Sequence, residues 1–162
     1  MIGDAVYYLG AASYSGVTTE QLYTAERGNV ICGACNSDTT KLTWTGIVGL
    51  MYPSDEYMVY GNGVNATCYD NPNGCSGTNA QAGWVYKSNI LEGQSSPSYT
   101  WLLSSYAGSS VGVLYAISDG ALSNYSSYNS LGVRPVVYLK SNIKIADGTG
   151  EVGSPYTLEE IQ

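Results

Sequence analysis

The chain has 162 residues, which is long enough for one domain that buries its own core. Its hydrophobic share of 44% is ordinary, whereas its charged share of 12% is about half the usual value. The net charge is −7 with only six basic residues, which argues against binding to a nucleic-acid backbone, because such binding needs clustered Lys and Arg. No stretch is apolar enough to span a bilayer, and the N-terminus lacks the pattern of a signal peptide.

The first quarter of the chain predicts a strand and then a helix. Residues 2–10 contain the apolar run Ala5 to Leu9, which favours a strand. Thr18 or Thr19 can cap a short helix that carries Glu20 near its positive end. We expect this helix to run to about Arg27 and to end at Gly28. The next apolar run, Trp44 to Tyr52, is bounded by Pro53 and predicts a buried strand.

Four cysteines lie in Gly- and Asn-rich segments that can bend to the short separation a disulfide requires. We therefore favour local pairing, Cys32 with Cys35 and Cys68 with Cys75, which indicates an oxidising compartment. A four-thiolate zinc site is the alternative, but the spacing of six residues between Cys68 and Cys75 is longer than zinc sites normally use. A redox-active pair at Cys32 and Cys35 would need a helix N-terminus, whereas the sequence there indicates a turn.

Residues 60–83 form a long Gly/Asn/Thr tract, and we expect a structured insert there because compact domains rarely carry such a tract without a use. Residues 94–99 predict a Ser/Pro loop leading to Trp101. A closing strand and turn are predicted near the end of the chain, from Ile143 and Ile145 and then residues 148–155. Residues 156–162 predict an exit segment.

A hairpin is predicted between these loops. Val111, Val113, Tyr115 and Ile117 alternate at period two, which is typical of a half-buried strand. Asp119-Gly120 supplies a two-residue turn, and a return strand is expected over residues 121–125. Residues 124–131 lack periodicity and predict a loop. The run 132–139 predicts a central strand, except that Pro135 cannot donate a ladder hydrogen bond and marks a bulge or an edge.

Residues 104–130 use a narrow set of residue types. Tyr, Ser, Gly and Asn dominate, and Asp119 is the one charged residue in this segment. Antibody-like binding loops use the same set, because Tyr gives wide amphipathic contact at low entropic cost and small residues adapt around it. The alternative is a Ser-rich surface hairpin whose tyrosines cover the core.

Catalytic signatures are sparse. The chain has no histidine, which removes the usual general base and the usual ligands of zinc hydrolases. The acidic residues are scattered, so solvated positions are favoured over a paired-carboxylate site. No nucleotide-binding glycine motif is present, and the calcium-binding triplets of animal lectins are absent. We therefore expect no enzyme activity, no cofactor and no bound metal.

Several short motifs carry a family resemblance. One pattern consists of a Trp, a Ser-rich turn, an alternating strand, an S-x-G turn, a variable loop and the motif G-V-R-P-V. It resembles the C-terminal segment of C-type lectin-fold proteins diversified by retroelements. The matching positions here are Trp101, Ser104, Ser118, Gly120, Gly132, Val133, Arg134, Pro135 and Val136. Upstream, Tyr7 to Gly10, Thr24 to Gly28 and Trp44 to Asp55 resemble Firmicutes surface proteins that carry this domain behind a type IV pilin-like helix.

The resemblance implies a single α+β domain over residues 1–162 with a C-type lectin-like fold. Such a domain has small antiparallel sheets, one or two short helices and long disulfide-stapled loops. It also implies an extracellular ligand-binding head on a cell surface or pilus, with any membrane-anchoring helix lying upstream of Met1. In the diversified families, adenine rewriting cannot yield Glu, Lys, Gln, Trp or Met, and none of these occurs between Ser104 and Ser130.

Direct ligand contacts are expected from the hairpin and the loop that follows it. A shift of one residue in register would exchange Leu114 and Ala116 for Tyr115 and Ile117. Arg134, flanked by apolar residues, is expected to be structural, as is Trp101. The predicted contacts are Tyr106, Ser109, Ser110, Leu114, Ala116, Asp119, Ser123, Tyr125, Ser127 and Tyr128.

The expected partner is a protein or glycan on another surface. One rival interpretation is a structural pilus or surface-layer subunit whose tyrosine hairpin packs against a neighbouring copy. A second is a carbohydrate-active enzyme that uses Asp55 or Asp119.

Overall fold

The computed structural model describes residues 1–28, 43–58, 99–117, 121–150 and 153–161, and side chains 56–58 lie outside this description. The N-terminal strand β1, Ala5–Tyr8, pairs antiparallel with β2, Thr43–Gly46. Helix α1, Thr19–Glu26, begins with a capping box in which Thr18 and Gln21 bond reciprocally. The predicted strand and helix are both confirmed.

The predicted buried strand over residues 44–52 is wrong. The chain instead forms β2, bends at Ile47 and forms the short strand β3, Val48–Leu50. Trp44 and Val48 are exposed, and burial begins only at Met51 and Tyr52. Helix α2, Pro53–Met58, follows directly, with proline at the first helical position, where its missing N–H costs nothing.

A three-stranded antiparallel sheet forms the body of the molecule. Its strands are β4, Tyr99–Ser105, β5, Gly112–Ile117, and β6, Leu122–Ser126, in that order. The alternating strand and its return strand are therefore confirmed, and the loop that follows begins at Ser127. The predicted turn at Asp119-Gly120 lies outside the described residues. Strand β4 was not predicted.

The other edge of β4 is completed by three separate backbone segments. At one end Trp101 N–H donates to Gly132 O at 2.9 Å, and Gly132 N–H donates to Tyr99 O at 3.0 Å. In the middle, Leu103 N–H donates to Met51 O at 2.9 Å. At the other end, Ala12 N–H donates to Ser105 O at 3.0 Å. Segments far apart in the sequence therefore meet on one strand.

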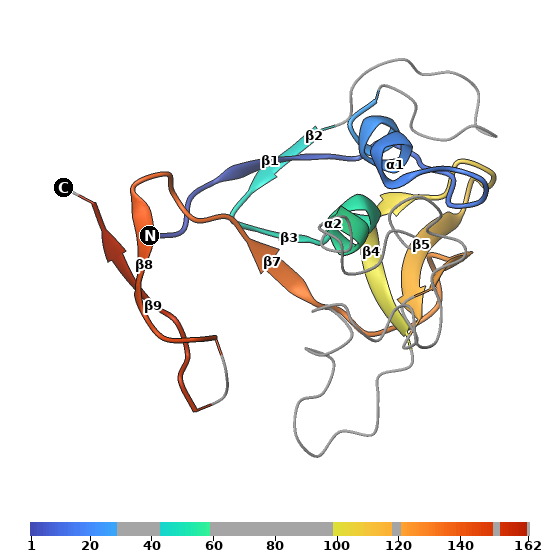
Figure 1. Ribbon diagram of the computed structural model, residues 1–162. Helices are drawn as coiled ribbons and strands as arrows, with labels where there is room; N and C mark the ends of the chain where they lie inside the picture. Colours follow the sequence, from blue (N-terminus) through green and yellow to red (C-terminus); the bar gives the residue numbers. More distant parts are fainter. Residues whose placement is uncertain (29–42, 59–98, 118–120, 151–152, 162) are drawn as a thin grey trace.

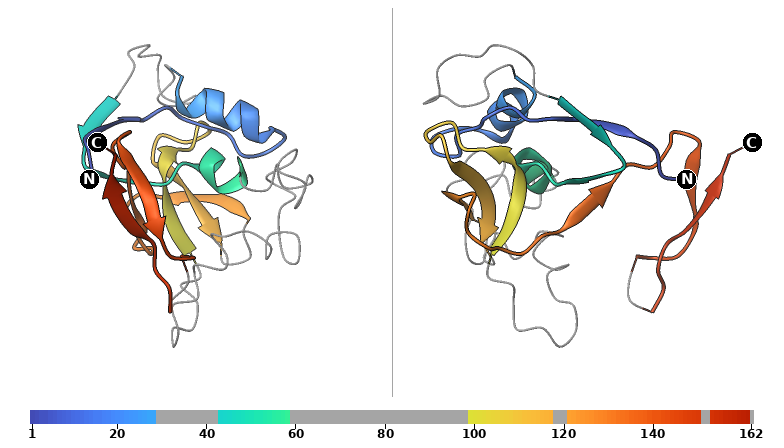
Figure 2. Two further views of the ribbon diagram at one scale, coloured as in Figure 1. Left: turned by 60° about the vertical axis from the view of Figure 1, so that its left-hand side comes forward. Right: turned by 180° about the vertical axis from the view of Figure 1, so that it is seen from behind.

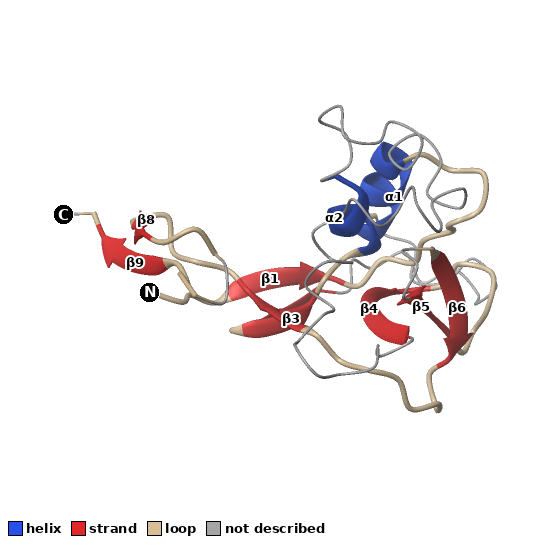
Figure 3. Ribbon diagram, turned by 60° about the horizontal axis from the view of Figure 1, so that its bottom comes forward, coloured by secondary structure: helices blue, strands red, loops and turns tan. Residues whose placement is uncertain are grey.

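The core lies between this sheet and the two helices, as Figures 1 and 3 show. Leu22 of α1 faces the inner side of the sheet, where Leu114 and Leu102 are almost fully buried. Tyr14, Val17 and Tyr106 pack against the margin of this cluster. The buried members of the core are Ala12, Leu22, Met51, Leu102, Leu114, Ala116 and Leu122.

Two further two-stranded sheets extend from the body. Strand β7, Pro135–Val137, pairs with β3, so among the described residues it has one neighbour and is not a central strand. Pro135 opens this strand, in agreement with the alternative of an edge. Strand β8, Ile143–Asp147, pairs with β9, Thr157–Glu160, so the predicted exit segment is wrong. This hairpin stands apart from the body in Figure 1 and in the right view of Figure 2.

Aromatic stacking fixes the start of this extension. Tyr7 of β1 is fully buried and stacks on Trp44 at 5.2 Å between ring centroids. The Tyr138 ring, just after β7, lies 5.7 Å from the same Tyr7 ring. The N-terminal residues then run beside the chain after β7, with Gly3 N–H donating to Tyr138 O at 3.2 Å. Tyr7 therefore joins β1, β2 and the segment that leads to β8.

The fold class is α+β. The described residues contain two short helices and small antiparallel sheets. All four cysteines fall within residues 29–42 and 59–98, outside the described part, and so does the predicted insert over residues 60–83.

We expect Gly10→Ala to destabilise the protein. Gly10 N–H donates to Glu26 O at 3.0 Å, and a Cβ added at Gly10 would overlap the carbonyl oxygens of Ala25 and Glu26 at the end of α1. Forcing extra atoms into a packed site typically costs about 1–3 kcal/mol, so the melting temperature followed by circular dichroism should fall by several degrees. Gly153→Ala is the matched control, since its added Cβ meets no atom within 4 Å. Equal melting temperatures for the two variants would contradict this account.

Candidate functional site

The outer side of the three-stranded sheet carries a row of aromatic side chains. Residues of β4 and β5 alternate between buried and partly exposed, and the inner set, including Leu114 and Ala116, builds the core. Directly paired residues share a face of a sheet, so Trp101, Tyr115 and Ser123 lie together on the opposite side. Tyr99 pairs with Ile117 and Tyr125 pairs with Val113 on that same side. We call Tyr99, Trp101, Tyr115 and Tyr125 the aromatic face.

The rings of the aromatic face touch edge to face, with Tyr115 at the centre. The Tyr99 ring centroid lies 5.3 Å from that of Tyr115 at an interplanar angle of 87°. Trp101 lies 6.3 Å from Tyr115 at 89°, and Tyr125 lies 6.4 Å from it at 66°. Such steep arrangements are favoured by the ring quadrupole, because the positive edge of one ring meets the negative face of the next.

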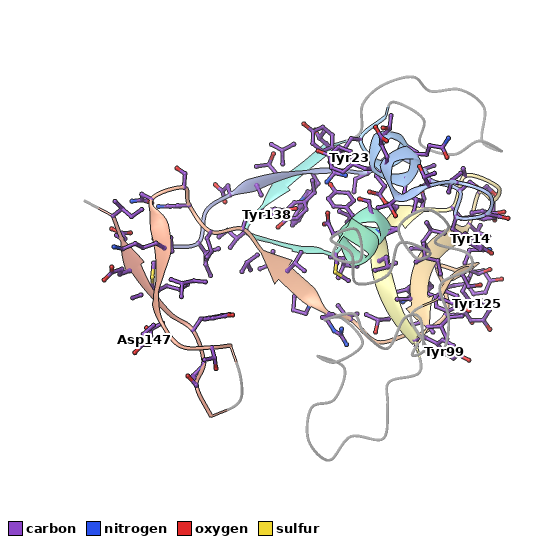
Figure 4. All side chains as sticks on the ribbon, in the orientation of Figure 1. Tyr14, Tyr23, Tyr99, Tyr125, Tyr138 and Asp147 are labelled. Atoms are coloured by element: carbon purple, nitrogen blue, oxygen red, sulfur yellow. The ribbon has the colours of Figure 1, made fainter. Side chains whose placement is uncertain are left out.

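The aromatic face is open at its margins and uncharged. Tyr99 and Tyr125 are 45% and 49% exposed. Figure 4 shows both labels beside β5, on the side of the sheet opposite to α2. Trp101 and Tyr115 are partly buried between them. No charged residue occurs among the described positions 99–117 and 121–133. Strands β4, β5 and β6 thus offer aromatic and hydroxyl groups without a charged side chain of their own.

The predicted contact set is partly corrected. Leu114 is fully buried and Ala116 is 6% exposed, because strand β5 turns them to the core, so neither can touch a ligand directly. The register alternative, with Tyr115 and Ile117 outward, describes the structure. Tyr106 is partly buried against the core and lies 5.6 Å from the Tyr14 ring, which gives it a packing role.

The other predicted contacts lie at or near the surface. Tyr128 is 80% exposed in the loop after β6, and Ser110 and Ser127 are also exposed. Ser123 and Ser109 are partly buried, and the Ser109 hydroxyl accepts a 3.3 Å hydrogen bond from Val111 N–H. The loop is tied at its start, where Ser127 N–H donates to Val111 O at 2.9 Å. Asp119 lies outside the described residues.

Sequence reasoning missed two of the four rings. Tyr99 was assigned to a loop and Trp101 was expected to be structural, whereas Tyr115 was placed outward only in the alternative register. The Trp101 backbone does anchor Gly132, while its side chain belongs to the aromatic face. The available signal was the spacing Tyr99, Trp101, Leu103, which has the period of a strand. Arg134 is partly buried.

A second cluster joins the two helices around a buried carboxyl group. Glu26, at the end of α1, is fully buried and accepts a 2.9 Å hydrogen bond from Ser54 N–H at the start of α2. The Ser54 hydroxyl donates to the other oxygen of the same carboxyl group. Glu26 therefore caps α2 from a neighbouring helix. Burial raises the pKa of Glu26 to about 7, although the hydrogen bonds from Ser54 and the charge of Arg27 oppose the increase.

Arg27 closes this cluster from the outside. Its guanidinium lies 3.3 Å from Glu26 Oε2 and 3.9 Å from Asp55 Oδ1. The guanidinium carbon also lies 3.6 Å from the Tyr23 ring centroid and 4.5 Å from that of Tyr52. Asp55 Oδ2 accepts a 3.4 Å hydrogen bond from Tyr52 N–H at the start of α2, and burial raises the pKa of Asp55. Asp55 thus has a structural role in capping α2.

Known proteins give no guide to this site. No protein-family model, curated protein or solved structure matches the chain significantly. Among the described residues, no helix is long and apolar enough to cross a membrane, and no cluster of His, Cys, Asp and Glu could hold a metal ion. The geometry of the aromatic face is therefore the main basis for a functional inference.

We expect the free energy of unfolding to rise as the pH is lowered from 8 to 5. Glu26 has a pKa of about 7 in the folded protein, above its usual value of 4.5, so the folded state binds the proton more tightly than the unfolded state. The stabilisation is complete below pH 4.5 and is lost as the pH rises through 7. Asp55 shifts in the same direction. Urea unfolding at several pH values, followed by far-UV circular dichroism, measures the effect.

Glu26→Gln is the matched variant for this prediction. Glutamine keeps the size of the side chain and an oxygen that accepts from Ser54 N–H, but it cannot take up a proton. Its stability should therefore vary less with pH over this range than that of the unaltered chain. The same slope in both proteins would show that another group governs the pH dependence.

Proposed function

We propose that this protein is a ligand-binding head of a bacterial surface or pilin-like protein, with a C-type lectin-like fold. The observation that carries the proposal is that the two sides of one sheet have different roles. Its inner side builds the core with Leu114 and Ala116, whereas its outer side exposes Tyr99 and Tyr125. Side chains on the outer side can therefore change without emptying the core. Such a surface suits a role in attachment to a protein or glycan on another cell.

The family resemblance adds to this argument. The G-V-R-P-V motif begins at Gly132, whose backbone bonds to Tyr99 and Trp101 at the margin of the aromatic face. Tyr128 lies in the loop just before that motif and, at 80%, is the most exposed tyrosine among the residues with described side chains. In the proposed arrangement, rewriting within the segment 104–130 by a retroelement would change Tyr115, Tyr125, Tyr128 and the neighbouring hydroxyl groups, while Tyr99, Trp101 and the bonded Gly132 stay in place. The cysteine pairs would staple the long loops of the extracellular domain.

Paired replacement of Tyr125 and Tyr128 by Ala tests the proposal. Tyr128 is 80% exposed and Tyr125 is about half exposed with one edge-to-face ring contact, so we expect a loss of about 1 kcal/mol in stability together with loss of binding. Binding is measured on arrays of cell-surface glycans and proteins, and the melting temperature is measured on the same samples. Tyr156→Ala is the control, since Tyr156 is 54% exposed but lies just before β9, away from the three-stranded sheet in sequence. A large fall in melting temperature for the paired variant would show that these tyrosines serve the core.

A structural role in a pilus or surface layer is the second candidate. It is favoured by exposed apolar side chains on the small two-stranded sheets, which are marginal structures when they stand alone in water. A neighbouring copy could cover them. The exposed residues of this group are Ile2, Val6, Trp44, Ile47, Val48, Val137, Leu139, Ile145 and Ile161.

This second candidate predicts self-association that depends on the β3–β7 sheet. Val48 and Val137 are directly opposite each other, and both are exposed. The double variant Val48→Asp with Val137→Lys places opposite charges across the pair and so preserves the sheet. Light scattering after size-exclusion chromatography should show oligomers of the unaltered chain and monomers of the double variant. A monomeric unaltered chain at high concentration would count against assembly through this surface.

A further inference from the structure

The aromatic face has the chemistry of a cation-binding surface. Aromatic rings carry negative charge on their faces and positive charge at their edges. Because Tyr115 meets three neighbours at angles of 66° to 89°, the rings of the aromatic face point in several directions. A cation that approaches within about 6 Å of a ring centroid is attracted by that ring, and neighbouring rings at such spacings can act together.

The charge distribution favours a positive ligand. The whole chain carries a net charge of −7, which attracts cations at long range. The described positions 99–117 and 121–133 carry no Lys or Arg, so the three strands that hold the rings add no positive charge; the next basic residue along the chain is Arg134, two residues after Gly132. The same net charge disfavours an anion at long range.

Elsewhere in the same protein, two tyrosine rings already contact a cationic side chain. The Arg27 guanidinium lies over the rings of Tyr23 and Tyr52, with centroid distances of 3.6 and 4.5 Å. In that cluster Glu26 and Asp55 also form ion pairs with the guanidinium, so both the rings and the carboxylates stabilise the cation. On the aromatic face the rings stand without described carboxylates, and a ligand cation would depend on them more heavily.

We propose that the aromatic face binds a partner protein through arginine side chains on that partner's surface. This inference rests on the proposed function and names the chemistry of the ligand. The guanidinium is planar, weakly hydrated and suited to stacking on aromatic rings, so it fits this surface better than a carboxylate or phosphate does. The rings extend across all three strands, from Tyr99 on β4 to Tyr125 on β6, which suits a protein surface more than a single small ion.

The test uses two peptides that differ in charge alone. One is an acetylated, amidated Gly-Arg-Gly-Arg-Gly peptide, and the other has citrulline, a neutral isostere, in place of arginine. Binding to the intact chain is followed by the NMR shift of the Trp101 indole N–H, assigned with Trp101→Phe. The arginine peptide should shift this signal with an affinity at least about fivefold higher than the citrulline peptide, and added salt should weaken binding.

Two matched variants test whether the arginine peptide binds at the aromatic face. Tyr125→Ala should reduce affinity for the arginine peptide about threefold or more, since it removes one exposed ring of the aromatic face, whereas Tyr156→Ala should leave it unchanged. Equal binding of the two peptides, no binding of either, or equal effects of the two variants would each overturn the inference.

The array experiment separates this inference from the function on which it rests. Binding to array proteins that present arginine, lost on Tyr125→Ala, agrees with both proposals. Binding to glycans or to proteins without basic patches preserves the ligand-binding function but overturns the arginine inference. Absence of any Tyr125-dependent target overturns both.

Discussion

Strand β4 is the element on which the rest of the fold depends, because its free edge is shared by three distant parts of the chain. The segments around Ala12, Met51 and Gly132 each bond to it through the backbone. Such bonds are insensitive to side-chain identity, since every residue other than proline offers the same donor and acceptor. The sheet is therefore held in place by main-chain contacts, while its outer side chains remain available for other roles.

The helix pair is held by a different interaction, and it carries a cost. Glu26 joins α1 to α2 through Ser54, yet it does so as a fully buried carboxyl group. Burial disfavours the charged form of Glu26 and raises its pKa to about 7, so the cost of desolvating the carboxylate offsets part of what its hydrogen bonds to α2 contribute to stability. Arg27 lies within reach and offsets part of that cost. The helices pack on the inner side of the sheet, and the aromatic face lies on the other.

The sequence predicts local features better than the pairing of strands. The period of two from Val111 to Ile117 predicted β5, and Thr18 with Gly28 marked α1 closely. It did not determine which face of β5 is buried, because Leu114 and Tyr115 are both apolar enough for a core. Strand β4 was missed because its neighbours on the free edge lie up to 93 residues away in sequence, as Ala12 and Ser105 do. Likewise, the apolar run 44–52 predicts burial, but sequence alone does not show whether another element packs on it. Among the described residues none covers Trp44, Ile47 or Val48, which are exposed.

The two ends of the loop after β6 are bonded to the sheet, by Ser127 to Val111 and by Gly132 to Tyr99. Residues 128–131 run between these two fixed points, and within them Asn129 donates to Ser126 O through its backbone N–H and its side-chain amide. Lengthening a closed loop costs little free energy once its ends are fixed, since the cost grows only with the logarithm of its length. Insertions and deletions, as well as substitutions, should thus be tolerated here, which would let related chains vary the reach of this surface and not merely its chemistry.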